Sequence, residues 1–192
     1  MYSVEFLPKE KWMGYILPIN FDAEEYYDTI INKTPDGFAV EFVKKPAVPP
    51  IEVRSEKYDF PDSLYQPHWE NAEAYGVILD GELIGAVEIC PETWSNRLIV
   101  TELWVRDGWR KKGIGKALME KAKAICEERD HRAVILETQT CNENAIGFYL
   151  HEGFELIGFD SCCYTNADIK RREVRLDLGW FPEKWRGIEK RR

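Results

Sequence analysis

A pair of glycines between a strand-like and a helix-like segment constrains this chain more than any other feature. Residues 98–105 are rich in apolar residues and have strand character, and apolar residues recur at helical spacing from Ile114 to Cys126. Gly113 and Gly115 therefore fall where a strand ends and a helix begins. The first N–H groups of a helix lack partners, the helix dipole is positive there, and glycine lets a ligand approach closely. The pattern predicts a pyrophosphate cradle, with an ordinary helix-opening turn as the alternative.

The cradle differs from the two common nucleotide-binding loops. A P-loop needs serine or threonine after its Gly-Lys pair, whereas Ala117 follows Gly115 and Lys116. A Rossmann loop needs a further glycine three positions after Gly115, where Leu118 stands. Both of these nucleotide-binding classes are therefore excluded.

A second motif occupies residues 142–154 and reads N-x-x-A-x-x-[FLY]-Y-x-x-x-G-F. Asn142, Ala145, Tyr149, Gly153 and Phe154 stand at its defined positions. The glycine pair and the preceding arginine read [RQ]-x-x-G-x-[GA]. With both motifs in this order, the chain resembles the GCN5-related N-acetyltransferase (GNAT) superfamily over about residues 70–178.

The resemblance implies an α/β (α+β) architecture, the GNAT fold. A mixed, mostly antiparallel sheet with a central parallel crossover would be flanked by helices, and acetyl-CoA would enter where the two central parallel strands splay apart. We expect a single domain over residues 1–192, with its core at 70–178. Residues 1–69 would supply an N-terminal strand and helices, and residues 179–192 a tail held by its aromatic residues.

The chain after residue 70 gives clear local signals. Asp80-Gly81 is a two-residue hairpin signal between strands at 72–79 and 82–90. Further strands are expected at 97–105 and 133–138, with a helix from Gly113 to near Arg129 that makes a right-handed parallel crossover. A closing hairpin would follow at 154–164 and 173–178.

The N-terminal part is harder to interpret. Residues 22–31 look like a short helix, with Asp22 as its N-cap. Residues 38–44 alternate weakly and predict a strand. Pro46, Pro49 and Pro50 predict an extended, non-helical link.

Charge and composition narrow the possible partners. The net charge of −8 argues against general nucleic-acid binding, and no apolar run is long enough to span a membrane. Residues 110–132 carry eight basic and four acidic residues, which suits a polyanionic cofactor, whereas the acidic remainder favours a cationic acceptor. Five cysteines without a signal peptide predict free thiols and a cytoplasmic protein. No ligand spacing predicts a metal site.

The resemblance implies acetyl-CoA as the co-substrate and adds residues 103–105 and Asn142 to the loop at 110–116 as its binding residues. The backbone of residues 103–105 would pair with the pantetheine arm and polarise the acetyl carbonyl. Asn142 would bond the pantetheine or cap its own helix, and both roles can hold together. The predicted cofactor-binding residues are Leu103, Trp104, Val105, Arg110, Lys111, Lys112, Gly113, Ile114, Gly115, Lys116 and Asn142.

Acetyl transfer to an amine needs a base, because a free alkylamine is protonated at neutral pH. It also needs a hydrogen-bond donor for the oxyanion and an acid that protonates the leaving sulfur. Tyr149 is the candidate acid because the tyrosine at this motif position lies near the thioester sulfur in many family members. The alternative is a core tyrosine packed beside Phe148. Glu102 is the candidate base, directly or through water, or else an exposed strand carboxylate.

A further set of residues is predicted to bind the acceptor amine. Trp104 would share a strand face with Glu102 and offer its ring to a cationic amine. Glu88 and Glu137 on neighbouring strands compete with Glu102 as the carboxylate that meets this amine. Residues 136–139 and 158–164 resemble the corresponding segments of streptothricin acetyltransferases, which acetylate an amine of a β-lysine side chain. By that resemblance, Asp160 and Tyr164 would line the acceptor site.

The sequence therefore predicts an acetyl-CoA-dependent N-acetyltransferase, monomeric or homodimeric, that acts on a primary amine of a small cationic acceptor such as streptothricin. A protein or peptide N-acetyltransferase and a non-catalytic acyl-CoA-binding regulatory module are the alternatives.

Overall fold

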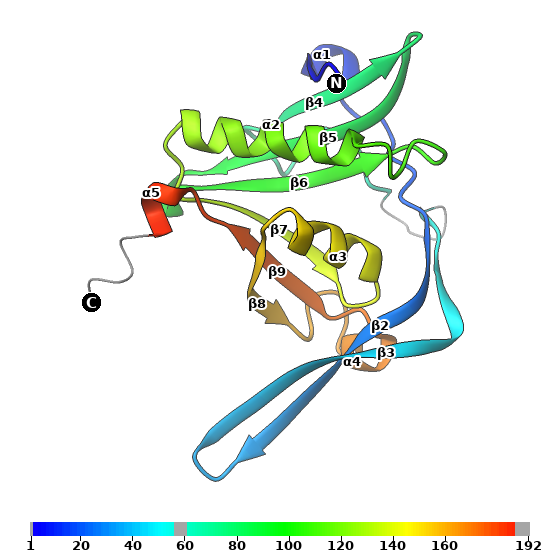
Figure 1. Cartoon of the computed structure of the whole chain (residues 1–192), viewed down its shortest axis with the longest axis vertical. Helices are drawn as coiled ribbons and strands as arrows, with labels where there is room; N and C mark the ends of the chain where they lie inside the picture. The colour runs from blue at the N-terminus through cyan, green and yellow to red at the C-terminus, as the bar shows by residue number, and fades with distance from the viewer. Residues whose placement is uncertain (1, 56–60, 187–192) are drawn as a thin grey trace. The chain divides into compact units, whose positions relative to one another are not determined.

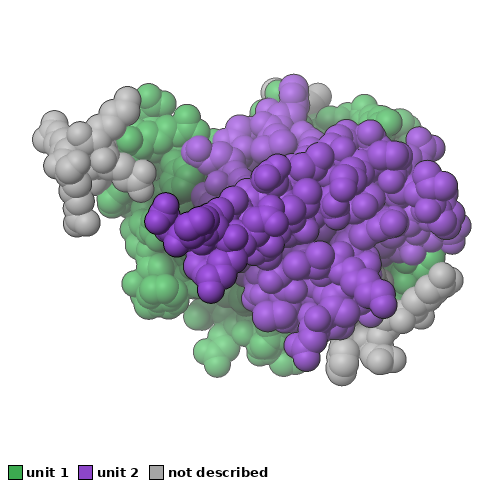
Figure 2. Space-filling model, turned by 90° about the horizontal axis from the view of Figure 1, so that it is seen from below, with its two compact units in different colours: residues 1–19, 54–136, 179–192 green, residues 20–53, 137–178 purple. Residues whose placement is uncertain are grey.

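The computed structural model of the chain describes residues 2–55 and 61–186. The chain divides into two compact units, coloured separately in Figure 2. Unit 1 comprises residues 1–19, 54–136 and 179–192, and unit 2 comprises residues 20–53 and 137–178. The single domain expected over residues 1–192 stays a prediction. In the described part of the chain, no helix is both long and apolar enough to cross a membrane.

Unit 1 is built on a mixed sheet whose strands run mostly antiparallel. The order of neighbours is β1-β4-β5-β6-β7, and β6 and β7 pair in parallel over residues 97–100 and 133–136. This confirms the predicted parallel crossover, and the β4–β5 pairing confirms the hairpin at Asp80-Gly81. The strands are β1 (Glu5–Leu7), β4 (Glu73–Leu79), β5 (Glu82–Glu92), β6 (Arg97–Val105) and β7 (Ala133–Gln139).

Helix α2 (Ile114–Glu128) makes the crossover and lies over β4, β5 and β6 (Figure 1). Its apolar residues recur at helical spacing, so one face is buried against the sheet. The buried residues are Ile114, Leu118, Met119, Ala122, Ile125 and Cys126. Among the residues that the structure describes, unit 1 also has the short helices α1 (Lys9–Trp12) and α5 (Glu183–Arg186) and the 3-10 turn η2 (Thr93–Ser95).

The close approach of α2 to β5 depends on Gly85. A Cβ atom at Gly85 would lie 2.6 Å from Ile114 Cγ2 and 3.2 Å from Leu118 Cδ1. We expect Gly85→Val to lower the free energy of unfolding by roughly 1–3 kcal/mol, because overpacking displaces the start of α2. Thermal unfolding followed by circular dichroism measures the change. Gly37→Val is the control, since a Cβ at Gly37 meets nothing within 4 Å; an equal loss in both variants would contradict the packing argument.

Unit 2 contains a long two-stranded ribbon, formed by β2 (Phe21–Thr34) and β3 (Gly37–Val53) and visible in Figure 1. Helix α3 (Glu143–His151) contacts β2. The end of β7 is followed across the sheet by β9 and then β8. The remaining elements are β8 (Glu155–Asp160), α4 (Asp168–Arg171) and β9 (Arg175–Trp180).

The predicted helix at residues 22–31 is wrong, because this segment belongs to strand β2. Ala23, Tyr26 and Thr29 are buried, and this spacing of three imitates a helical face. A register shift between Ala23 and Glu25 changes which residues of the strand face inward. The β-branched and aromatic residues of the segment favour a strand once β3 is available as a partner, and Asp22 pairs with Glu52 instead of capping a helix.

The proline-rich segment is extended, as predicted, but it is part of strand β3 and not a link. Glu25 pairs with Pro46, and the next pair is Ala23 with Ile51, so Pro49 and Pro50 fall in the irregular stretch between. Proline has no N–H to donate, which confines it to such positions in a sheet. The predicted strand at residues 38–44 is confirmed.

Candidate active site

The predicted cofactor loop lies in unit 1 between β6 and α2, as the glycine pair indicated. Gly113 has φ +85° and is the N-cap residue of α2, and no side chain caps the helix. Lys111 also adopts a positive φ of 61°. Arg110 Nη2 lies 3.0 Å from Asp107 Oδ1. The loop therefore brings the backbone of residues 111–116 to the amino end of a fifteen-residue helix.

The space beside Gly113 is open, which is what a bound group would need. A Cβ atom built there meets nothing within 4 Å. The first N–H groups of α2 have no partners within the helix, and the helix dipole is positive at this end. Lys112 Nζ lies 4.6 Å from the centre of the Trp109 ring. A basic helix amino end with open space beside its first residue fits a pyrophosphate.

Strand β6 is irregular at the position where the catalytic base was predicted. Glu88 pairs with Glu102 and Ile89 with Val100, so Thr101 is an extra residue and the strand has a β-bulge. Bulges are frequent next to active sites because they redirect a side chain. Glu102 is partly exposed, as a base that exchanges protons with solvent requires.

Glu88, the competing carboxylate, lies inside unit 1. Its side chain is fully buried and accepts hydrogen bonds from Tyr65 N, at 2.5 Å, and from Thr101 Oγ1, at 2.8 Å. Burial raises the pKa of Glu88, although these two donors stabilise the ionised form. Glu88 holds β6 and the segment around Tyr65 together, which is a structural role that its sequence position did not reveal.

Trp104 is packed in the apolar core of unit 1. Its side chain is 4% exposed, and its Nε1 donates to Pro18 O at 3.2 Å. The Arg106 guanidinium lies 5.8 Å from the centre of its ring. The geometry therefore gives no support to the expectation that the ring binds a cationic amine. The backbone of Leu103, Trp104 and Val105 follows the bulge directly.

Unit 2 carries the second motif on and around α3. Asn142 caps α3, since its Oδ1 accepts from Ala145 N at 3.2 Å, as predicted. Tyr149 is 8% exposed, and its ring lies 5.4 Å from that of Phe148 and 5.9 Å from that of Phe154. Aromatic neighbours thus hold the ring of Tyr149 in place. This packing is expected both of an oriented proton donor and of a core tyrosine, so it does not distinguish the two roles.

Three of the predicted acceptor residues also belong to unit 2. Glu137 lies on β7, Asp160 ends β8, and Tyr164 follows in the loop between β8 and β9. Desolvation, followed by the negative charge of Glu137, raises the pKa of Tyr164, although the residue is 40% exposed. Desolvation also raises the pKa of Glu137, although 48% of its side chain is exposed, and Arg175 opposes that change.

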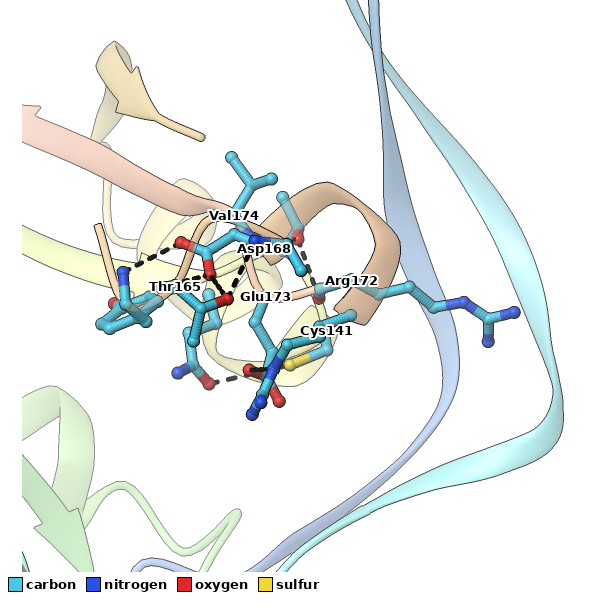
Figure 3. Close-up of polar contacts among 11 residues, drawn as sticks. Cys141, Thr165, Asp168, Arg172, Glu173 and Val174 are labelled. Atoms are coloured by element: carbon cyan, nitrogen blue, oxygen red, sulfur yellow. Dashed lines mark hydrogen bonds and ion pairs between the residues drawn. The ribbon is translucent and has the colours of Figure 1, made fainter. Parts of the chain in front are cut away.

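A buried carboxylate that was not predicted fixes the loop that carries Tyr164 (Figure 3). Asp168 is fully buried and accepts from Tyr164 N at 2.9 Å and from Thr165 N and Oγ1, both at 2.7 Å. Thr140 Oγ1 accepts from Val174 N at 3.1 Å and donates to Arg172 O at 2.9 Å. The sequence signal was the short spacing between Thr165 and Asp168, because Asp side chains commonly bond nearby backbone groups in loops.

Residues 43–154 match the family model described as the acetyltransferase (GNAT) family. The chain belongs to the GNAT family of acetyltransferases.

Among curated GNAT relatives, a streptothricin acetyltransferase from Streptomyces lavendulae is 33% identical over 140 residues, which cover 71% of this chain and 73% of the relative. A streptothricin acetyltransferase from Escherichia coli is 32% identical over 112 residues, covering 58% and 64%. A crystal structure from Bacillus anthracis, described as a candidate streptothricin acetyltransferase in complex with acetyl coenzyme A, is 21% identical. It covers 95% of this chain and 98% of its own, with a TM-score of 0.71. The GNAT fold predicted from the two motifs is confirmed.

As a GNAT acetyltransferase, the chain uses acetyl-CoA and transfers the acetyl group to an amine. The described residues include no group of three or more histidine, cysteine, aspartate or glutamate side chains placed to hold a metal ion. All five cysteines have free thiols, three of them buried and two exposed.

Proposed function

We propose that this acetyltransferase acetylates a primary amine of a small cationic acceptor of the streptothricin class. The relationship to the Streptomyces lavendulae streptothricin acetyltransferase carries the proposal, because it extends over 71% of the chain. The chemistry of unit 2 supports it. Glu137, Asp160 and Asp177 supply carboxylates on β7, β8 and β9 that would attract an ammonium group.

The roles that we propose for individual residues follow from the two sequence motifs. Backbone N–H groups of residues 111–116 bind the pyrophosphate of acetyl-CoA, with Arg110 beside them. The backbone of residues 103–105 holds the pantetheine arm and the acetyl carbonyl, and Asn142 contributes from the start of α3. Glu102 accepts the proton of the acceptor amine, directly or through water, and Tyr149 donates a proton to the departing sulfur. Acetyl-CoA supplies an activated acetyl group as a thioester.

The purified chain, incubated with acetyl-CoA and streptothricin, tests the proposal. We expect release of CoA with a free thiol and a streptothricin product heavier by one acetyl group. Spermidine and a lysine-rich peptide are the matched acceptors, and acetyl-CoA without acceptor is the blank. A higher rate with the lysine-rich peptide than with streptothricin would contradict the proposed small acceptor and indicate a protein substrate. Binding of acetyl-CoA without acetylation of any amine would instead indicate the regulatory module.

A further inference from the structure

Arg175 on β9 contacts both carboxylates of the acceptor residues proposed on β7 and β9. Its Nη1 lies 2.7 Å from Glu137 Oε2, and its Nε lies 2.8 Å from Asp177 Oδ1. Its Nη1 also lies 3.7 Å from Cys163 Sγ, in the loop between β8 and β9. One guanidinium thus links its own strand β9 to β7 and to the loop between β8 and β9.

Charged and titratable groups from three segments surround Arg175. Strand β7 contributes Glu137, β9 contributes Asp177, and the β8–β9 loop contributes Cys163 and Tyr164. Strand β8 pairs with β9 on the edge opposite β7, and a Cβ at Gly158 on β8 would be 3.3 Å from Asp177 Oδ2. When Glu137 and Asp177 are both charged, the cluster of Glu137, Asp177 and Arg175 carries one net negative charge.

We propose that Arg175 sets the charge of the Glu137–Asp177 cluster within the acceptor site, leaving this cluster one net negative charge that binds a single ammonium group and favouring the neutral, nucleophilic form of the bound amine. This inference rests on the proposed function. Two carboxylates alone would bind a cation more tightly but would also hold its proton more strongly. A guanidinium beside them weakens the binding of the cation and also disfavours protonation of the amine, because the guanidinium and the ammonium carry like charges.

The inference predicts opposite changes for the two members of the ion pair. Arg175→Gln removes the positive charge, so the acid limb of the kcat–pH profile should move about one pH unit toward alkaline pH. The KM for streptothricin should fall roughly three- to tenfold, since the repulsion of the ammonium is lost. Glu137→Gln removes a negative charge, so its acid limb should move toward acid pH and its KM should rise. Initial rates at saturating acetyl-CoA between pH 6 and 9.5 measure both.

Two further variants separate charge from structure. Arg171→Gln breaks a comparable ion pair of unit 2, between Arg171 Nε and Glu173 Oε2 at 2.7 Å, and should leave the profile unchanged. The double variant Arg175→Gln/Glu137→Gln keeps one net negative charge on Asp177, so its acid limb should return toward that of the wild type.

A lower rate for Arg175→Gln at every pH, with no displacement of the limb, would overturn the inference and make Arg175 a structural residue. A displacement of the same sign in the Arg175 and Glu137 variants would also overturn it. Failure of the wild-type chain to acetylate streptothricin is a separate outcome, because it removes the proposed function on which the inference rests.

Discussion

Replacing Gly113 by valine is expected to weaken acetyl-CoA binding by roughly tenfold to a hundredfold or more. The side chain would enter the open space beside the amino end of α2, where we propose that the pyrophosphate lies. Hydrogen bonds to charged groups contribute about 1.5–3 kcal/mol each, so displacing the phosphate from one of them accounts for this range. Calorimetric titration of the protein with acetyl-CoA measures the affinity.

Backbone strain needs a separate control, because Gly113 has φ +85° and a β-branched residue is strained in that region. Gly108 is suitable, since it lies in the same loop at φ +80° and a Cβ there also meets nothing within 4 Å. Gly108→Val should carry similar strain with a smaller loss of affinity. Equal losses in the two variants would attribute the effect to strain, and normal affinity of Gly113→Val would remove the pyrophosphate cradle.

The elements that could be predicted from sequence are those fixed by neighbouring residues. The hairpin at Asp80-Gly81 needs positive φ at both residues, and the structure has 52° and 84°. Helix α2 shows its helical period directly, and Asn142 caps α3 as its residue type suggested. Each of these features depends on interactions within a few positions of the chain, so local pattern was sufficient.

The features that could not be predicted depend on distant partners. The segment 22–31 becomes a strand because β3 pairs with it, and its buried residues imitate a helix. Trp104 stands two residues after Glu102 and carries an indole N–H, yet its indole packs in a core completed by Leu7, Trp12 and Tyr65. Arg175 meets Glu137 only because β7 and β9 are neighbours in the sheet. The roles predicted for the site residues remain predictions until variants are measured.

Tyr149→Phe is expected to lower turnover by roughly tenfold to a thousandfold, a range that overlaps the lower part of the usual contribution of general acid catalysis, about a hundredfold to ten-thousandfold. The substitution keeps the ring and its packing between Phe148 and Phe154 but removes the hydroxyl proton. The volume is nearly conserved, so thermal stability and acetyl-CoA affinity should change little. Steady-state rates with streptothricin, together with thermal unfolding and acetyl-CoA titration, separate these effects.

Glu102→Gln provides the comparison that distinguishes an acid from a base. If Glu102 removes the proton of the acceptor amine, its loss should lower the rate most at low pH, where most of the amine is protonated. Tyr149→Phe should instead lower the rate across the neutral range, because a phenol keeps its proton there and can donate throughout. Full turnover of Tyr149→Phe with its best acceptor would make the tyrosine a packing residue and leave water as the acid. A large loss of thermal stability in that variant would point to the same conclusion, since the hydroxyl would then support the fold and not the reaction.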